Sequence, residues 1–334
     1  MTWKVGRTPR SAADALVGFL TLLATGGSGG TRADRGVRPT RKLLACAVCL
    51  ISAHPVFAAT YILTVAGLGG EPDYEQRFTM LATDTDKVLR AGGQTDRIVE
   101  TLKGADATKA KVEASLNRIA SQAKPADAFV LMMIGHGTFD GTEYKFNLPG
   151  PDISGTELAG LMNKIPAGRQ LVVDMTSSSG GAVSAFKKDN RVVITATKSG
   201  MEKNATVFAR YWVEALRDPT ADVDKNETIS ALEAFQYAEK KTAQFYSEQK
   251  RLATEHPQVD DQQRASAFPL LKFGSASAVV TDPAKRELIA KKEDIENKID
   301  ALKYQKSLLA PDDYRKQLQA LLLDLARAQE AIDK

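Results

Sequence analysis

Cysteine and histidine are scarce in this sequence. Its 334 residues include two cysteines and three histidines, and both cysteines, Cys46 and Cys49, lie within the first fifty residues. The rest of the chain can therefore form no disulfide, no thiolate metal site and no cysteine nucleophile. Charged residues make up 26% and hydrophobic residues 43% of the chain. These values exclude a disordered protein, a collagen-like repeat and a multi-span membrane protein.

The segment that ends at Ala59 has the organisation of a secretory signal peptide. Arg41 and Lys42 precede an apolar run from residue 43 to residue 51, and small residues follow up to Ala59. A membrane-spanning helix needs about 20 apolar residues, so this run is too short to span a membrane. We therefore predict cleavage after Ala58 or Ala59, an exported protein that is periplasmic or secreted, and no membrane span.

Residues 1–36 precede a signal that is already complete. They hold a second apolar stretch, from residue 15 to residue 24, followed by Gly-Gly-Ser-Gly-Gly. We hypothesise that translation begins near Val37, and we assign residues 1–59 to an N-terminal extension and signal peptide. Leu44-Ala45-Cys46 resembles a lipoprotein cleavage site only weakly, because no apolar run precedes it closely enough.

The basic charge of the sequence is concentrated in this same segment. The formal net charge of +4 comes from 45 Lys and Arg against 41 Asp and Glu. Eight of these basic residues and two of the acidic ones precede residue 59, so their removal leaves 37 against 39 and a net charge near −2. The remaining lysine pairs lie on predicted solvated helix faces and form no basic groove, so we expect no nucleic-acid partner.

Between residues 60 and 281, strand-like apolar segments alternate with amphipathic helical segments. Residues 128–134 form a continuous apolar run, which is typical of a strand buried on both faces. This alternation predicts an α/β domain whose mostly parallel sheet carries helices on both faces. Strands are predicted at 61–66, 97–102, 128–134, 170–175 and 191–197, and helices at 73–91, 108–124, 154–163, 180–186, 204–216 and 230–250.

Residues 282–334 have a different pattern. Two amphipathic helical stretches flank a break at Ala310-Pro311-Asp312-Asp313. Each stretch needs a partner for its apolar stripe, so the sequence predicts a C-terminal antiparallel helical hairpin or coiled coil. The same stripes suggest a homodimer formed through this hairpin.

Small and polar residues follow several predicted strands, at the edge of the sheet where functional groups gather in α/β proteins. Gly135-His136-Gly137 follows one buried strand, and a hydroxyl-rich turn from Thr176 to Gly181 follows another. Together they offer a base, a nucleophile position and backbone N–H donors for an oxyanion. The alternative is an isolated loop histidine and a turn that only starts a helix. The glycines after residue 66 lack the spacing of a dinucleotide-binding loop.

At these residues the chain resembles the caspase-like clan of cysteine peptidases and, within it, a bacterial secreted branch of the legumain family. Such enzymes place His-Gly after one buried strand and end a later strand in a pattern like Asp-Ala-Cys-x-Ser-Gly-Gly. The matching residues here are Ile134-Gly135-His136-Gly137 and Met175-Thr176-Ser177-Ser178-Ser179-Gly180-Gly181. When the two patterns are aligned on the closing Ser-Gly-Gly, the cysteine position falls on Ser177.

The resemblance implies roles for individual residues. His136 would be the general base, Ser177 would hold the nucleophile position, and the N–H groups of Gly137 and Ser177 would form the oxyanion hole. Lys198 and Ser199 follow the strand at whose end the family builds part of its specificity pocket. The resemblance covers the α/β domain, residues 60–281, and it implies no required cofactor.

The sequence departs from the family pattern at the nucleophile. A thiol is a few per cent ionised near neutral pH, whereas a serine hydroxyl needs a well-oriented base in order to react. The acidic residue of the pattern is also displaced, because Met175 stands at its position and Asp174 lies one place earlier. We therefore predict an exported, catalytically impaired peptidase homologue that recognises a peptide or protein. The alternative is an active peptidase-type hydrolase that uses Ser177 with His136 as general base.

A separate segment, residues 222–233, resembles a calcium-binding loop. Oxygen-bearing side chains occupy loop positions 1, 3, 5, 9 and 12, which are Asp222, Asp224, Asn226, Ser230 and Glu233. Position 6 holds Glu227 where the sharp turn favours glycine. The same residues also suit a helix start, because Ser230 and Glu233 have capping-box spacing. The sequence thus allows a weak single calcium site or a helix cap.

Overall fold

The structure is a computed structural model that describes residues 58–91, 96–272, 283–304 and 309–333. The predictions of a signal peptide, of a start near Val37 and of a lipoprotein site fall mainly on residues 1–57, which lie outside the described residues. Within the described ranges, no helix is both long enough and apolar enough to cross a membrane.

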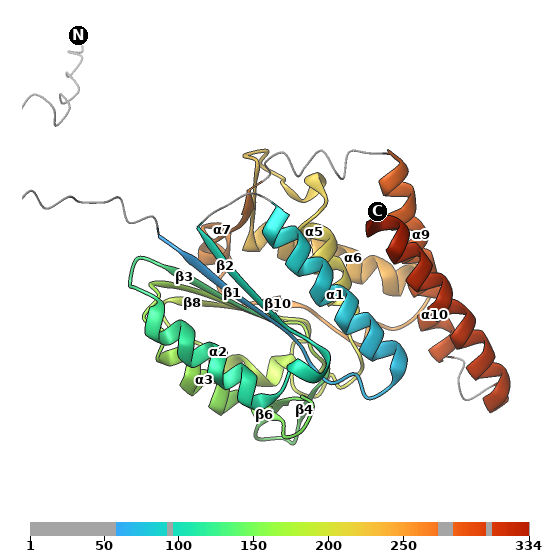
Figure 1. Ribbon diagram of the computed structural model, residues 1–334, viewed down its shortest axis with the longest axis horizontal. Coiled ribbons are helices and arrows are strands. Elements are labelled where there is room, and N and C mark those ends of the chain that lie inside the picture. Colours follow the sequence, from blue (N-terminus) through green and yellow to red (C-terminus); the bar gives the residue numbers. More distant parts are fainter. Residues whose placement is uncertain (1–57, 92–95, 273–282, 305–308, 334) are drawn as a thin grey trace, which may run out of the picture. The chain divides into compact units, whose positions relative to one another are not determined.

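A six-stranded sheet forms the centre of the domain, in the order β10-β8-β7-β3-β1-β2 (Figure 1). Five strands are mutually parallel, and the edge strand β10 runs antiparallel to β8. The strands are β1 Thr60–Ala66, β2 Arg97–Leu102, β3 Ala128–Ile134, β7 Arg169–Asp174, β8 Arg191–Thr195 and β10 Gln258–Val259. The first five confirm the predicted strands to within two residues at each end.

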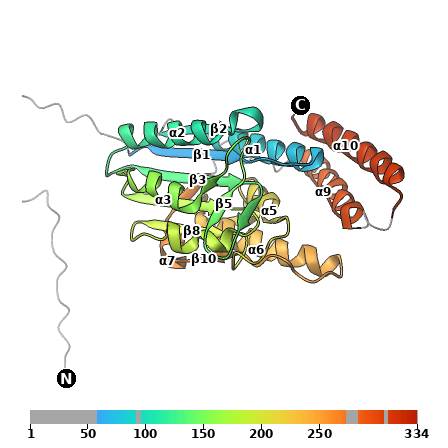
Figure 2. The ribbon, with the colours of Figure 1, turned by 90° about the horizontal axis from the view of Figure 1, so that it is seen from below.

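Helices cover both faces of this sheet, and the two views of the ribbon agree on the layers (Figures 1 and 2). One face carries α1 Pro72–Ala91, α5 Phe208–Ala215, α6 Ala231–Glu248 and α7 Gln262–Ser266. The other carries α2 Lys109–Gln122, α3 Gly155–Asn163 and α4 Val183–Phe186. Successive strand residues alternate between the two cores, so that Ile62 packs on the first face and Leu63 on the second. The prediction of an α/β fold with a mostly parallel, doubly covered sheet is confirmed.

Two small antiparallel sheets were not predicted from the sequence. One joins β4 Gly137–Phe139, β5 Tyr144–Phe146 and β6 Ile153–Ser154, and the other pairs β9 Thr228–Ser230 with β11 Pro269–Lys272. Each of these strands has two to four residues. Such strands are too short to show a periodic pattern. The first small sheet begins directly after His136, so it shapes the candidate site.

Two predicted helices begin later than expected, α4 at Val183 instead of residue 180 and α5 by four residues. The pattern predicts a helix over 204–216, but α5 begins at Phe208. The carboxylate of Glu255 accepts hydrogen bonds from the backbone N–H groups of Val207 and Phe208 at 2.7 and 3.2 Å. The hydroxyl of Thr206 donates to the carbonyl of Met175. A residue almost fifty positions away therefore fixes the start of this helix.

The C-terminal residues form the predicted helical hairpin, with α9 Pro283–Tyr304 and α10 Pro311–Asp333 packed against each other. The hairpin also contacts the α/β domain through a buried polar cluster. Asp84 of α1 pairs with Lys292 of α9 at 3.0 Å and accepts a hydrogen bond from Gln329 of α10 at 3.0 Å. Arg217, just after α5, pairs with the same carboxylate at 2.9 Å. The homodimer expected through the hairpin stays a prediction.

Candidate functional site

The predicted catalytic residues meet at the carboxyl edge of the sheet. β3 ends at Ile134 and the neighbouring β7 ends at Asp174, so the loops that follow them lie side by side. The hydroxyl of Ser177 donates to the carbonyl of Gly137 at 3.0 Å, and the N–H of Gly137 donates to Ser177 Oγ at 3.1 Å. The side chain of Ser177 is therefore engaged, as donor and as acceptor, with the peptide groups of a single residue.

Glycine is needed where these two loops approach. A Cβ atom on Gly137 would lie 2.4 Å from the carbonyl oxygen of Ser177 and 2.5 Å from the ring of Tyr144. A Cβ on Gly180 would lie 2.2 Å from the backbone nitrogen of Ser199. All three separations are shorter than nonbonded atoms tolerate. The glycines of the predicted motif thus allow close backbone contact, first between the loops after β3 and β7 and then between those after β7 and β8.

The ring of His136 packs against aromatic side chains of α1. Its centroid lies 4.6 Å from that of Tyr74 and 5.1 Å from that of Phe78, in edge-to-face geometry with both. Its backbone carbonyl accepts a hydrogen bond from the N–H of Asn147. Both hydrogen bonds of the Ser177 hydroxyl go to Gly137. The roles of His136 as general base and Ser177 as nucleophile stay predictions.

A buried carboxylate lies under the site. Asp174 Oδ1 accepts hydrogen bonds from the hydroxyl and the N–H of Thr176 and from the hydroxyl of Tyr144. Burial raises the pKa of Asp174 to about 6, although these hydrogen bonds oppose the rise. The Thr176 hydroxyl also contacts the carbonyl oxygen of Ser177 at 3.0 Å. Asp174 therefore supports the turn that carries Ser177 from inside the core.

Ser178 is the strained residue of this turn. Its backbone adopts φ 58° and ψ 8°, in the left-handed region that non-glycine residues rarely occupy. Its N–H donates to the carbonyl of Glu202 at 2.8 Å, and its side chain is fully buried. Strain of about 1–3 kcal/mol at such a residue persists only where the surroundings hold it, and it is frequent at functional sites.

Lys198 and Ser199 lie in the loop that follows β8, close to the same turn. The Lys198 side chain is exposed and lies 3.8 Å from the carboxylate of Glu202. The Ser199 hydroxyl accepts a hydrogen bond from the N–H of Met201. Glu202 also contacts His256 Nδ1 at 2.5 Å, which joins this loop to the segment before β10. The assignment of Lys198 and Ser199 to a specificity pocket stays a prediction.

A hollow of about 320 Å³ is lined in part by Tyr74, whose ring also packs against that of His136. Arg77 of α1 and Arg251 after α6 bring positive charge to its lining. Its walls come from α1, from the segment before α5 and from the end of α6: Tyr74, Arg77, Asn204, Ala205, Thr206, Val207, Phe245, Tyr246, Arg251 and Thr254. Aromatic walls with a few polar groups are typical of a pocket that receives a side chain.

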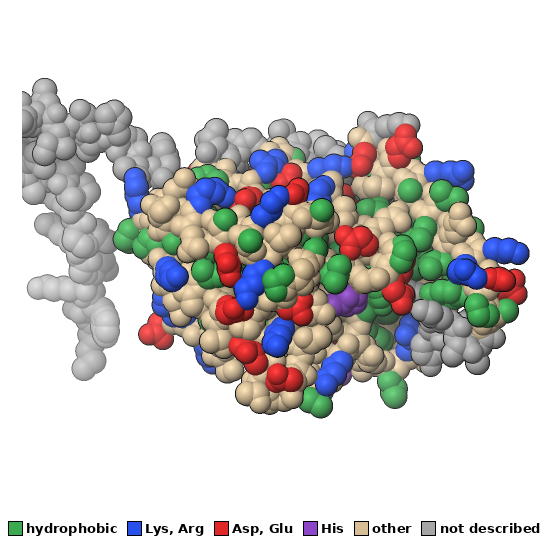
Figure 3. Space-filling view, turned by 60° about the horizontal axis from the view of Figure 1, so that its bottom comes forward, with side chains coloured by type: hydrophobic (Ala, Val, Ile, Leu, Met, Phe, Trp, Pro, Cys, Tyr) green, Lys and Arg blue, Asp and Glu red, His purple; other side chains and the backbone are tan. Residues whose placement is uncertain are grey.

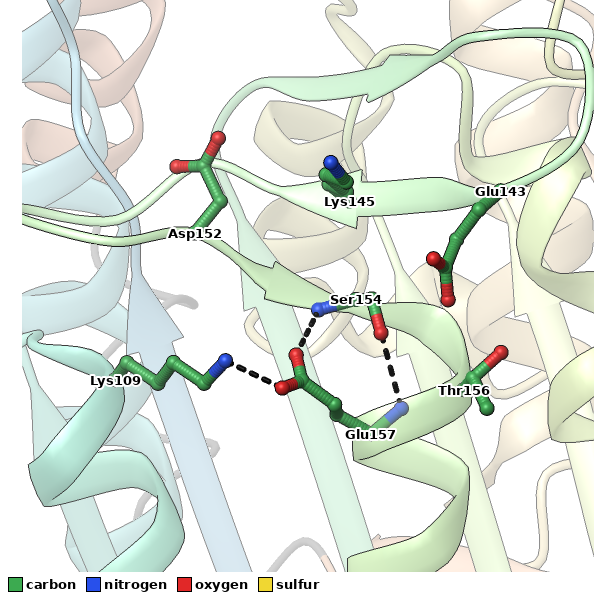
Figure 4. A pocket seen from close by; sticks show the side chains of 7 residues that line it. All are labelled: Lys109, Glu143, Lys145, Asp152, Ser154, Thr156 and Glu157. Atoms are coloured by element: carbon green, nitrogen blue, oxygen red, sulfur yellow. Dashed lines mark hydrogen bonds and ion pairs between the residues drawn. The ribbon is translucent and has the colours of Figure 1, made fainter.

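A larger hollow, of about 560 Å³, lies over β5, β6 and the start of α3 (Figure 4). Two of its charged groups pair with each other, because Lys109 contacts Glu157 at 2.5 Å, and Glu157 also closes the predicted capping box with Ser154. We interpret it as a surface depression among charged and polar side chains. On the face shown in Figure 3, acidic and basic side chains are also mixed over the surface, and histidine lies at the surface beside hydrophobic side chains.

The calcium-like loop brings its carboxylates together. One oxygen each from Asp222, Asp224 and Glu233 lies within 4.8 Å of the others. Glu227, at the position where glycine is expected, adopts a left-handed φ of 63°. The predicted capping box of Ser230 and Glu233 is confirmed. The helix cap and the convergence of carboxylates therefore occur together, since Glu233 takes part in both.

Several residues of the site carried no signal in the sequence. Tyr74 and Phe78 appear as ordinary core positions of an amphipathic helix, and Tyr144 lies in a strand too short to predict. Glu255 is the clearest of the residues that the sequence did not predict. Burial raises its pKa to about 7, and its carboxylate accepts three hydrogen bonds. An acidic residue between a histidine and a polar loop has no pattern that marks it as buried.

No protein-family model and no curated protein sequence matches this chain. Among solved structures, protein GSU0716 from Geobacter sulfurreducens is 14% identical, with a TM-score of 0.44 over 64% of this chain and 99% of that one. The Drosophila initiator caspase Dronc is 10% identical, with a TM-score of 0.41 over 70% of this chain and 92% of that one. These likenesses are too distant to identify a family or an activity.

Proposed function

We propose that this chain is a caspase-like peptidase homologue of the legumain type in which Ser177 stands at the nucleophile position and catalysis is impaired. Its function in this proposal is to recognise a peptide or protein at the carboxyl edge of the sheet. One observation carries the proposal: the Ser177 hydroxyl is hydrogen-bonded to both the N–H and the carbonyl group of Gly137.

This pairing opposes hydrolysis in two ways. A serine nucleophile must pass its proton to a base, and here that proton is directed at the carbonyl of Gly137. An oxyanion hole needs unoccupied N–H donors, and the N–H of Gly137 already donates to Ser177 Oγ. Ser177 is also only 2% exposed. A reaction would first have to break both hydrogen bonds and open the turn.

Recognition is favoured by the surroundings of the site. The 320 Å³ hollow shares Tyr74 with the surroundings of His136, and exposed apolar side chains lie in the loop after β8 and next to Arg251, which lines the hollow. Met201 is 68% exposed in the loop after β8, and Leu252 is 91% exposed in the segment that leads to β10. In this proposal, these side chains offer apolar contact area to a bound peptide.

The test is binding of an extended-peptide library to the full chain. We expect binding that Phe245→Ala weakens at least tenfold and that Ser177→Ala leaves unchanged, because the ligand would contact the hollow rather than the hydroxyl. Leu323→Ala, at a side chain 53% exposed on α10, is the matched control. Cleavage of library peptides that Ser177→Ala abolishes would instead establish the active hydrolase, with His136 as general base.

We further propose that residues 222–233 bind a single calcium ion weakly. The convergence of Asp222, Asp224 and Glu233 favours this, because hard oxygen ligands in one small volume suit calcium. Asn226 and Ser230 would supply the remaining side-chain oxygens of the loop. Bound calcium would offset most of the negative charge of the loop and join it to the start of α6.

Calorimetric titration with calcium tests this site. We expect heat of binding for the unmodified chain and its loss in Asp224→Asn. Glu227→Gln is the matched control, since it removes one charge from the same loop without removing one of the converging carboxylates. Absence of heat at millimolar calcium would contradict the calcium proposal.

We also propose that the protein is exported to the periplasm or the medium. This part of the proposal rests on the sequence pattern that ends at Ala59.

A further inference from the structure

The C-terminal hairpin contacts the same helix that holds the ring of His136. On α1, Tyr74 and Phe78 are one turn apart, and both flank that ring. Met80 and Asp84 lie on a neighbouring face of α1, where Met80 packs against the apolar cluster of the hairpin. Phe78 and Asp84 are six residues apart, about 9 Å along the helix axis. A single rigid element therefore spans both contacts.

Asp84 fixes the position of the hairpin on α1. It is 1% exposed and receives donors from three other segments, through Arg217, Lys292 and Gln329. Burial acts to raise the pKa of Asp84, but the charges of Arg217 and Lys292 outweigh it and hold the pKa below its usual range. A buried carboxylate with such partners tolerates little displacement, because each shift leaves a buried charge unpaired.

A second connection from the hairpin reaches another part of the hollow's lining. Glu296 of α9 is 4% exposed and lies 3.7 Å from Arg210 of α5. The guanidinium of Arg210 lies 5.3 Å from the centroid of Phe245, in the geometry of a cation–π contact. Phe245 lines the same hollow as Tyr74. The hairpin thus supports one wall of the hollow through α1 and the other through Arg210.

We infer that the hairpin acts as a brace for the recognition site, with Asp84 and Arg210 as positioning residues. When the hairpin is docked, α1 holds Tyr74 and Phe78 against His136, and Arg210 holds Phe245 in the wall that comes from α6. When the hairpin is released from the domain, both walls of the hollow lose this support. This inference deepens the proposed function, and it rests on that function only for the ligand that the hollow receives.

The test follows the histidine ring signals of the full chain by NMR, together with hydrogen exchange of α9 and α10. In Asp84→Asn we expect faster exchange in both hairpin helices, loss of the ring-current shift of His136 and weaker cross-peaks from His136 to Tyr74 and Phe78. The signals of His256 serve as the internal reference and should not move. Asp312→Asn, in an exposed pair with Arg315, is the matched control and should change neither readout.

Two results of these ligand-free measurements would overturn the inference. One is faster exchange of the hairpin with unchanged His136 signals, and the other is unchanged exchange in both Asp84→Asn and Glu296→Gln. If Asp84→Asn does not fold, Glu296→Gln decides by the same readouts. Because no ligand is present, this outcome does not depend on the proposed function. Peptide binding that survives a released hairpin would separate the two, leaving recognition intact and the brace refuted.

Discussion

Two aspartates are buried to almost the same extent in this molecule, yet their surroundings differ in charge. Asp84, at the junction with the hairpin, is 1% exposed and lies among Arg217, Lys292 and Gln329. Asp174, under the candidate site, is 0% exposed and accepts hydrogen bonds only from neutral donors, on Thr176 and Tyr144. The pKa is lowered at Asp84 and raised to about 6 at Asp174.

This difference in pKa distinguishes Asp84, which supports the junction with the hairpin, from Asp174, which lies under the candidate site. A compensated charge such as that of Asp84 stays ionised and holds elements together over the ordinary pH range. An uncompensated carboxyl such as that of Asp174 changes its charge near neutral pH, directly beneath the turn that carries Ser177. The junction should therefore respond strongly to mutation and weakly to pH, whereas the site should respond to both.

The largest effect is expected at the junction. Asp84→Ala leaves Arg217 and Lys292 buried without their carboxylate, and removing one partner of a buried ion pair costs about 3–5 kcal/mol. Chemical denaturation should show this loss in the free energy of unfolding. Asp312→Ala, in the exposed pair with Arg315, should cost less than about 1 kcal/mol. Equal losses in the two variants would refute the contrast between buried and exposed pairs.

The pH dependence of stability is the next largest effect. The pKa of Asp174 is about 6 in the fold and near 3.8 when unfolded, so folding favours its protonated form. Its stabilising contribution is complete below pH 3.8 and is lost as the pH rises through about 6. The loss amounts to about 3 kcal/mol. Urea unfolding at a series of pH values should show a fall over this range that Asp174→Asn flattens.

Glu255 should cause a second loss of folding stability with rising pH, at a higher pH than Asp174. Burial raises its pKa to about 7. A residual decline in stability up to that pH should therefore remain in Asp174→Asn and disappear when Glu255→Gln is added. A decline that neither substitution alters would show that both carboxylates stay ionised in the fold.

A smaller effect is expected from the glycines. Gly137→Ala places a methyl group against the carbonyl of Ser177 and should cost about 1–3 kcal/mol as overpacking. Gly160, in the exposed part of α3, has no atom within 4 Å of an added Cβ. Gly160→Ala should therefore stabilise the chain by about 0.5–1 kcal/mol. Opposite signs in thermal unfolding would support the close approach of the two loops.

The sequence predicts the layers of this fold well because they depend on long periodic segments. Continuous apolar strands and amphipathic helices give five central strands and most helices, and the break at Pro311 marks the hairpin. The features that the sequence does not predict depend on contacts between distant residues. The late start of α5 is set by Glu255, and β4 and β5 are stabilised by pairing that few residues encode.

The candidate site shows the same division. His136 and Ser177 are predicted as neighbours because both follow strands at one edge of a parallel sheet, and the structure brings Ser177 into contact with Gly137. The sequence could not show that the Ser177 hydroxyl would pair with that peptide. Nor could it place Tyr74 and Phe78 around the histidine, because aromatic residues at helical spacing resemble any other core positions.

The central claim is that Ser177 does not act as a nucleophile. Its most direct test is labelling of the full chain with a serine-directed fluorophosphonate, read by mass spectrometry of the peptide that contains Ser177. A reference serine hydrolase should be labelled completely under the same conditions. We predict that Ser177 stays unlabelled in the unmodified chain and in His136→Ala alike. Labelling of Ser177 that His136→Ala abolishes would contradict the account.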